Sequence, residues 1–155
     1  MEDLAWHIKN ENLFGSVGQN KYLQLWDVRA PSMSNPIQYC VAHPDTENCL
    51  SFNPLNEWSV ITGSSYKTVK IWDTRKISKS NDLYNCVHAF KQHTGKVFQV
   101  GWNPHNKMVF ASGCHGRKVL LWDINKIGDI QNGENVKNGP PELPFFSEWS
   151  YKKNN

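Results

Sequence analysis

The sequence predicts an all-β protein in which one four-stranded unit is repeated about three times. The first observation is a Trp-Asp pair that recurs at intervals of 46 and 50 residues, with its aspartates at Asp27, Asp73 and Asp123. The second is an Asn-Pro marker in the same register, since "SFNP" at 51–54 returns as "GWNP" at 101–104. The third is an alternation of apolar residues before each Trp-Asp pair, which is typical of strands rather than helices.

Each repeat divides into short apolar segments separated by turn residues such as Asn-Pro and Gly-Ser. Leu23 and Leu25 carry the alternation in the first repeat, and Val119 and Leu121 carry it in the third. In the second repeat the four predicted strands are roughly Asn48–Phe52, Trp58–Gly63, Thr68–Trp72 and Tyr84–Phe90. Helical periodicity is confined to a possible turn near Ile124–Ile130.

The repeats set the expected organisation of the chain. We expect three units at 1–46, 47–96 and 97–125, the last incomplete, then an insert loop at 126–146 and a divergent tail at 147–155. Four short strands per 40 to 50 residues, closed by Trp-Asp, are the signature of a β-propeller blade.

The composition indicates a globular chain and excludes several classes of protein. Of the 155 residues 39% are hydrophobic and 20% are charged, and no apolar run approaches the roughly 20 residues of a membrane span. The N-terminus lacks the pattern of a secretory signal, and the four cysteines form no CxxC pair, so we expect a reduced, intracellular protein. A net charge of +3 is no signal for nucleic-acid binding.

The motifs resemble those of WD-repeat proteins, and more narrowly those of the retinoblastoma-associated histone-binding family, the Msi-type chaperone subunits. The resemblance lies in "EDLAWH" at 2–7, "LFGSV" at 13–17, "NCLSFNP" at 48–54, "KTVKIWD" at 67–73, "VFQVGWNPHN" at 97–106 and "NGPPEL" at 138–143. It implies about three blades of a seven-bladed ring. It also implies a nuclear, non-enzymatic scaffold whose partners are core histones or their basic tails and the subunits of chromatin assembly, deacetylase or methyltransferase complexes.

Aligning the repeats with one another locates a candidate binding surface. Glu2, Asn48 and Phe98 occupy equivalent positions at the start of the innermost predicted strand of each blade. Such positions form an arc around one mouth of a propeller, or they simply cap loops. The resemblance implies that this mouth binds a basic histone tail or a corepressor peptide, with these three residues as ligand positions.

The insert loop is a second candidate site. In the family that the sequence resembles, a loop of this kind and an N-terminal helix clamp a histone helix, and Pro140, Pro141, Glu142 and Leu143 match its PPEL element. The acidic run expected before that element instead reads "QNGENVKN". We therefore expect no helix clamping by this chain.

Two alternatives concern other classes of function. Arg29 and Arg75 follow Trp-Asp by two residues and resemble the motif by which some WD proteins dock onto the adaptor of a cullin-type ubiquitin ligase, although an arginine there is more often simply solvated. The other alternative is a product without autonomous function. It is motivated by the buried network of WD blades, because its aspartate position holds Asn20, Tyr66 and Gly116 instead.

Catalysis finds little support in the sequence. The six histidines are scattered, Cys114 and His115 are adjacent and would point to opposite faces of a strand, and there is no Walker loop and no GxGxxG motif. We expect no enzyme activity, cofactor, metal, membrane contact or direct sequence-specific binding of nucleic acid. One buried charge is also expected, because Glu47 occupies the position that Val97 fills one repeat later.

Overall fold

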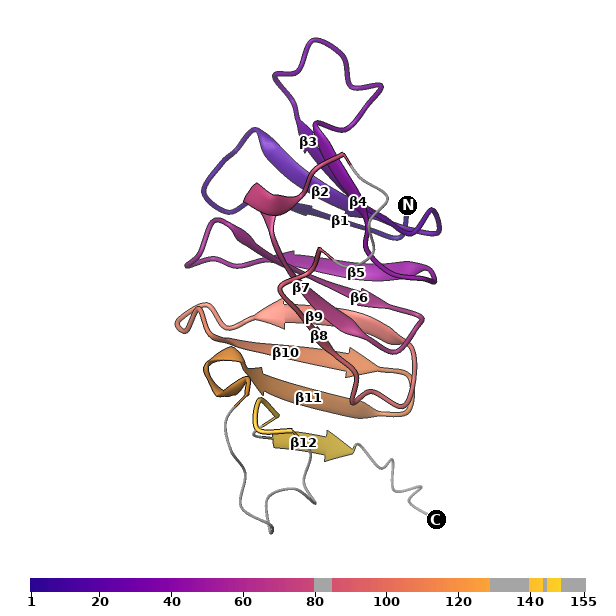
Figure 1. Ribbon diagram of the computed structural model, residues 1–155, viewed down its shortest axis with the longest axis vertical. Helices are drawn as coiled ribbons and strands as arrows, with labels where there is room; N and C mark the ends of the chain where they lie inside the picture. The colour runs from indigo at the N-terminus through magenta and orange to yellow at the C-terminus, as the bar shows by residue number, and fades with distance from the viewer. Residues whose placement is uncertain (80–84, 129–139, 144, 149–155) are drawn as a thin grey trace, which may run out of the picture.

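Three antiparallel sheets of four strands each follow one another along the long axis of the molecule (Figure 1). The computed structural model describes residues 1–79, 85–128, 140–143 and the backbone of 145–148. Each sheet is formed by one sequence repeat and its strands pair in chain order, so the prediction of an all-β fold with four-stranded repeats is confirmed. No helix among the described residues is long and apolar enough to cross a membrane.

The strands recur in the register of the repeats. The first sheet contains β1 (Asp3–Trp6), β2 (Leu13–Val17), β3 (Tyr22–Asp27) and β4 (Gln38–Val41). The second contains β5 (Glu47–Phe52), β6 (Ser59–Ser64), β7 (Val69–Asp73) and β8 (His88–Phe90). The third contains β9 (Val97–Trp102), β10 (Val109–Cys114), β11 (Lys118–Asp123) and β12 (Phe145–Glu148). Two 3-10 turns, η1 (Thr74–Lys76) and η2 (Ile124–Lys126), follow the second and third Trp-Asp pairs.

The third sheet differs from the expectation of an incomplete unit. Strand β12 pairs with β11, with Leu121 opposite Phe145 and Lys118 opposite Glu148. The end of the predicted insert and the start of the predicted divergent tail therefore form a fourth strand. The Trp-Asp spacing could not reveal it, because this strand is only four residues long and follows an insert of irregular sequence.

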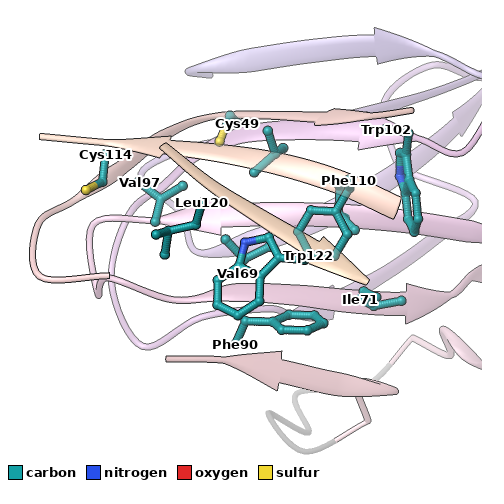
Figure 2. Close-up of a cluster of buried hydrophobic side chains, with 12 residues drawn as sticks. Cys49, Val69, Ile71, Phe90, Val97, Trp102, Phe110, Cys114, Leu120 and Trp122 are labelled. Atoms are coloured by element: carbon teal, nitrogen blue, oxygen red, sulfur yellow. The ribbon is translucent and has the colours of Figure 1, made fainter. Parts of the chain in front are cut away.

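The core lies in two layers, one between each pair of neighbouring sheets. In the first layer Leu23 and Leu25 of β3 lie in one cluster with Phe52 and Trp72 of the second sheet. In the second layer Val69, Ile71 and Phe90 lie against Phe110, Leu120 and Trp122 of the third sheet (Figure 2). Alternation along each strand sends one set of side chains into each layer, so the middle sheet is covered on both faces.

Candidate functional site

The starts of β1, β5 and β9 form one end of the stack of sheets. These three strands are the first of their sheets, and β5 packs beside both β1 and β9. The turn between the second and third strands of each sheet lies at this same end. It is hydrogen-bonded to the segment that precedes the first strand: the Ser65 N–H, for example, donates to the Thr46 carbonyl at 2.9 Å. We call this end, defined by Glu2, Asn48 and Phe98, the inner-strand end.

Glu2 precedes β1 and its side chain is exposed. One carboxylate oxygen, Oε1, accepts a hydrogen bond of 3.0 Å from Gln19 Nε2, while the backbone N–H of Glu2 donates to the Val17 carbonyl at 2.9 Å. A hollow of about 460 Å³, lined in part by Gln19, Asn20 and Trp26, opens beside it. The carboxylate is therefore held in place and remains accessible to a cationic side chain.

Asn48 is held more firmly than a free ligand position would be. It lies at an irregularity in the pairing of β5 with β6, between Glu47 and Cys49. Its amide Nδ2 donates to the Val97 carbonyl at 2.6 Å and contacts Ser65 Oγ at 3.2 Å. Both amide hydrogens thus have acceptors within the protein, and Asn48 ties the second sheet to the third at the inner-strand end.

Phe98 is a large exposed apolar side chain at this end. It is 48% exposed on β9, and its ring lies 5.0 Å from the imidazole of His115 in a tilted arrangement. An exposed aromatic ring braced by a second ring offers a surface for the aliphatic stem of a lysine or arginine.

Cations surround the inner-strand end in a repeated pattern. Lys21, Lys67 and Arg117 are equivalent residues in the turns between the second and third strands, with positive φ values of 67°, 63° and 62°. All three are exposed, whereas the carboxylates of Glu2 and Asp45 precede the first strands. Exposed Lys96 also directly precedes the first strand β9, so both signs of charge occur beside the inner strands, while the turns between the second and third strands carry positive charge.

Behind this end, the second sheet contains a complete buried polar network. Trp72 Nε1 donates to Thr62 Oγ1 at 2.9 Å, and Thr62 Oγ1 lies 2.8 Å from His43 Nε2. The other ring nitrogen of His43 lies 2.9 Å from Thr68 Oγ1. The expectation that Tyr66 leaves this network unsatisfied is wrong, because the hydroxyl two residues later takes the place of the missing carboxylate.

The third sheet has the same network with one partner missing. Ser112 Oγ lies 2.6 Å from His93 Nε2 and accepts the Trp122 indole N–H at 2.8 Å. His93 Nδ1 is buried and has no hydrogen-bond partner among the described residues. Gly116 provides no side chain there, and Lys118 stands at the position of Thr68. Burial lowers the pKa of His43 to about 3 and that of His93 to about 4, with a smaller effect from Lys70 and Lys118 respectively.

In the first sheet, the hydrogen bond of this network among the described residues runs from Trp26 Nε1 to Ser16 Oγ, at 2.9 Å. Asn20 Oδ1 accepts the backbone N–H of Tyr22 at 3.3 Å, so the asparagine forms a turn hydrogen bond.

Glu47 is a fully buried carboxyl group, as its position in the repeat predicted. Neither oxygen has a hydrogen-bond partner of good geometry among the described residues: the nearby Ala42 N–H donates to the Lys21 carbonyl and only weakly favours the charged carboxylate. Burial raises the pKa of Glu47 to about 8, against a smaller lowering by Lys70. Lys70 Nζ donates to the Ala42 carbonyl at 2.7 Å and lies 5.5 Å from the centre of the Trp72 ring.

The PPEL residues of the insert form a structural contact with the second sheet. Glu142 is largely buried, with Oε1 3.3 Å from His88 Nε2, and its backbone carbonyl accepts the N–H of Asp123 at 2.8 Å. Leu143 packs against the second core layer, and its N–H donates to the Pro140 carbonyl, closing a turn that contains Pro141. The expected loop from 129 to 139 lies outside the described residues.

Arg29 and Arg75 lie at the opposite end of the sheets from Glu2. Each guanidinium forms a two-point ion pair with the aspartate of its own Trp-Asp motif, at 2.7 Å for Asp27 and 2.8 Å for Asp73. The side chains are 63% and 59% exposed. The structure therefore places both where a partner can reach them, already paired with a carboxylate.

Within the described residues no group of three or more His, Cys, Asp or Glu side chains could hold a metal ion. Burial raises the pKa of Cys40 and Cys49 to about 12, which disfavours the thiolate form.

Comparison with known proteins agrees with this geometry. The model for "WD domain, G-beta repeat" matches residues 34–73 and 84–123. Each match begins with or just before the last strand of one sheet and ends with the third strand of the next, so the sequence repeat spans two blades. The chain is 36% identical over 146 residues to histone acetyltransferase type B subunit 2 of Debaryomyces hansenii, a match that covers 92% of this chain and 34% of the relative. The chain thus spans about a third of the length of that curated relative. The chain belongs to the WD-repeat family.

Proposed function

We propose that the chain is a non-enzymatic, histone-binding scaffold of chromatin complexes in the nucleus, and that its inner-strand end binds basic, histone-tail-like peptides. The observation that carries this proposal is that an exposed aromatic ring, Phe98, and an accessible carboxylate, Glu2, occupy equivalent positions of the third and first sheets at the inner-strand end. The similarity to a histone acetyltransferase subunit supports the class of partner.

The chemistry of the surface favours a lysine- or arginine-bearing peptide that lies across the inner strands. One cationic side chain of the peptide would pair with Glu2, and the aliphatic stem of another would cover Phe98. Lys21, Lys67 and Arg117 would repel a peptide bound further out. Asn48 acts as a positioning residue, since its amide is already bound to Val97.

Titration of a fluorescent, unmodified histone-tail peptide into the purified chain tests the proposal. Phe98→Ala and Glu2→Gln are each expected to weaken binding by about fivefold to thirtyfold, as for the loss of 1–2 kcal/mol. Met33→Ala is the matched control, because Met33 is 46% exposed at the other end of the sheets. Unchanged affinity in both inner-strand variants, or no binding by the folded chain, would refute the proposal.

Docking onto the adaptor of a cullin-type ubiquitin ligase is the alternative, and the exposure of Arg29 and Arg75 is the observation that favours it. That function predicts capture of the adaptor which is lost in Arg75→Ala and unaffected in Phe98→Ala. The two variants therefore separate the two functions.

A further inference from the structure

A small pocket opens over the outer strands of the second sheet, where the chain crosses to it from the first. Its volume is about 380 Å³, at the small end of the range for ligand pockets. We call it the outer-strand pocket, and its described lining includes Pro44, Tyr66, Thr68, Lys70, Ala89 and Lys91. Glu2, Asn48 and Phe98 are not among the described residues that line it.

The register of β7 and β8 brings two lysines to one face of the second sheet. Lys70 of β7 lies directly opposite Ala89 of β8. Thr68 and Lys91 stand two positions along from these residues, so all four side chains project from the same face. Trp72 projects from this face too and is buried in the core layer against the first sheet. The pocket therefore adjoins the surface that the first sheet covers.

Lys70 keeps its ammonium group in a partly dry environment. Its Nζ donates to the Ala42 carbonyl at 2.7 Å, across the junction of the two sheets, and lies 5.5 Å from the centre of the Trp72 ring. Burial lowers the pKa of Lys70 and the charge of Lys91 lowers it further, while neighbouring thiols and the carboxyl of Glu47 act in the opposite direction. Two like charges thus act on each other at the pocket, and an anion bound there would relieve their repulsion.

The described lining of the pocket contains cations and no carboxylate. Asp45 follows Pro44 in the chain but is not part of that lining, and its Oδ1 accepts the N–H of Thr46 at 2.7 Å. Glu47 is fully buried and has its pKa raised to about 8, so it is mostly protonated at neutral pH. Exposed Lys67 in the adjoining turn adds a further positive charge. The potential at this surface therefore favours an anionic ligand.

The rest of the described lining is mostly apolar. Pro44 and Ala89 present carbon atoms, and the ring of Tyr66 belongs to a residue that is 58% exposed. The hydroxyl of Thr68 already lies 2.9 Å from His43 Nδ1, within the buried network. Such a surface suits a ligand that combines a carboxylate with an adjacent apolar group, which is the chemistry of an acidic peptide rather than of an inorganic anion.

We propose that the outer-strand pocket binds an acidic peptide segment of a partner protein, in which a glutamate or aspartate stands beside an apolar residue. Lys91 pairs with the carboxylate, the charge of Lys70 adds to the attraction, and the apolar side chain lies against Pro44 and Ala89. This site goes beyond the proposed histone-tail surface, because it selects a partner of the opposite charge and uses other residues.

The thiol of Cys86 provides a direct readout of occupancy. Cys86 lines the pocket and is partly exposed, whereas Cys40, Cys49 and Cys114 are buried. The purified chain is treated with iodoacetamide in the presence of the capped probe peptide Ac-Gly-Glu-Leu-Glu-Gly-NH2, and mass spectrometry follows the modification of Cys86. Well above its dissociation constant, the peptide should slow this alkylation by about fivefold or more, because a bound ligand shields the thiol. The same peptide with glutamine in place of both glutamates should leave the rate unchanged.

Variants at exposed positions test the role of charge. Lys91→Gln should raise the peptide concentration for half-protection by about threefold to fivefold, and Lys91→Arg should retain the parent value. Lys107→Gln makes the same change of charge in the exposed loop between β9 and β10, so it is the matched control and should behave like the parent.

The proposal is overturned if the glutamate peptide gives no protection, if the glutamine peptide protects equally well, or if Lys91→Gln and Lys107→Gln behave alike. Phe98→Ala should leave the protection of Cys86 unchanged. A failure of this proposal is therefore distinguishable from a failure of histone-tail binding.

Discussion

Replacing Glu47 by glutamine should stabilise the protein, and the gain should grow with pH. The buried carboxyl has its pKa raised to about 8 from an ordinary value of 4.5, so the folded protein holds it protonated while the unfolded chain releases the proton. A raised pKa contributes stability that is present below pH 4.5 and lost as the pH rises through 8. The gain in unfolding free energy for Glu47→Gln should therefore rise from near zero at pH 4.5 to about 3 kcal/mol at pH 7.

Urea denaturation followed by tryptophan fluorescence at several pH values measures this difference directly. His43 and His93 titrate in both proteins, so their contributions cancel when the two are compared. Glu11→Gln, at an exposed site, is the matched control and should change stability by less than about 0.5 kcal/mol. If Glu47→Gln is no more stable than the parent at pH 8, the carboxyl is stabilised in its charged form and the reasoning fails.

Three further predictions concern the buried histidines. In the Glu47→Gln variant, lowering the pH from 6.5 to 5 should reduce the free energy of unfolding by about 2 kcal/mol per buried histidine. The reason is that the pKa values of His43 and His93 are lowered in the folded protein, so only the unfolded chain binds these protons. Equal stability at pH 7 and pH 5 would contradict this. Thr68→Val should cost about 1–3 kcal/mol in urea denaturation by removing a partner of His43, while Thr68→Ser should cost less; equal costs would argue against the hydrogen bond. Lys118→Thr should be more stable than Lys118→Val by about 1 kcal/mol, because the threonine hydroxyl can hydrogen-bond to His93 Nδ1. Thermal unfolding of the two variants measures this difference, and equal midpoints would contradict it.

The repeat spacing predicted the parts of the fold that depend on periodicity. The three Trp-Asp pairs placed the third strand of every sheet, and comparison of equivalent positions marked Glu47 as a buried charge where Val97 is apolar. These predictions succeed because one sheet-to-sheet interface is repeated along the chain, so each position reports the environment of its equivalents.

The sequence could not predict features that depend on local geometry. Counting seven residues back from the aspartate of Trp-Asp points to Tyr66 as the partner of His43. In the structure the partner of His43 Nδ1 is instead the hydroxyl of Thr68, two residues later. Asn48 was expected to face a ligand, but the spacing does not reveal that its amide reaches across to the Val97 carbonyl. His7 stands at an asparagine position, and only the geometry shows that its imidazole reproduces both hydrogen-bonding roles of an asparagine amide.

The most direct test of the account is a ¹⁵N-resolved NMR titration of the chain with an unmodified histone-tail peptide. The account predicts a dispersed spectrum in which shifts concentrate at the inner-strand end, at the amides of Glu2, Asn48, Phe98 and His115, while Arg29 and Arg75 at the other end do not change. A folded spectrum without shifts, or shifts centred on Arg29 and Arg75, would contradict it.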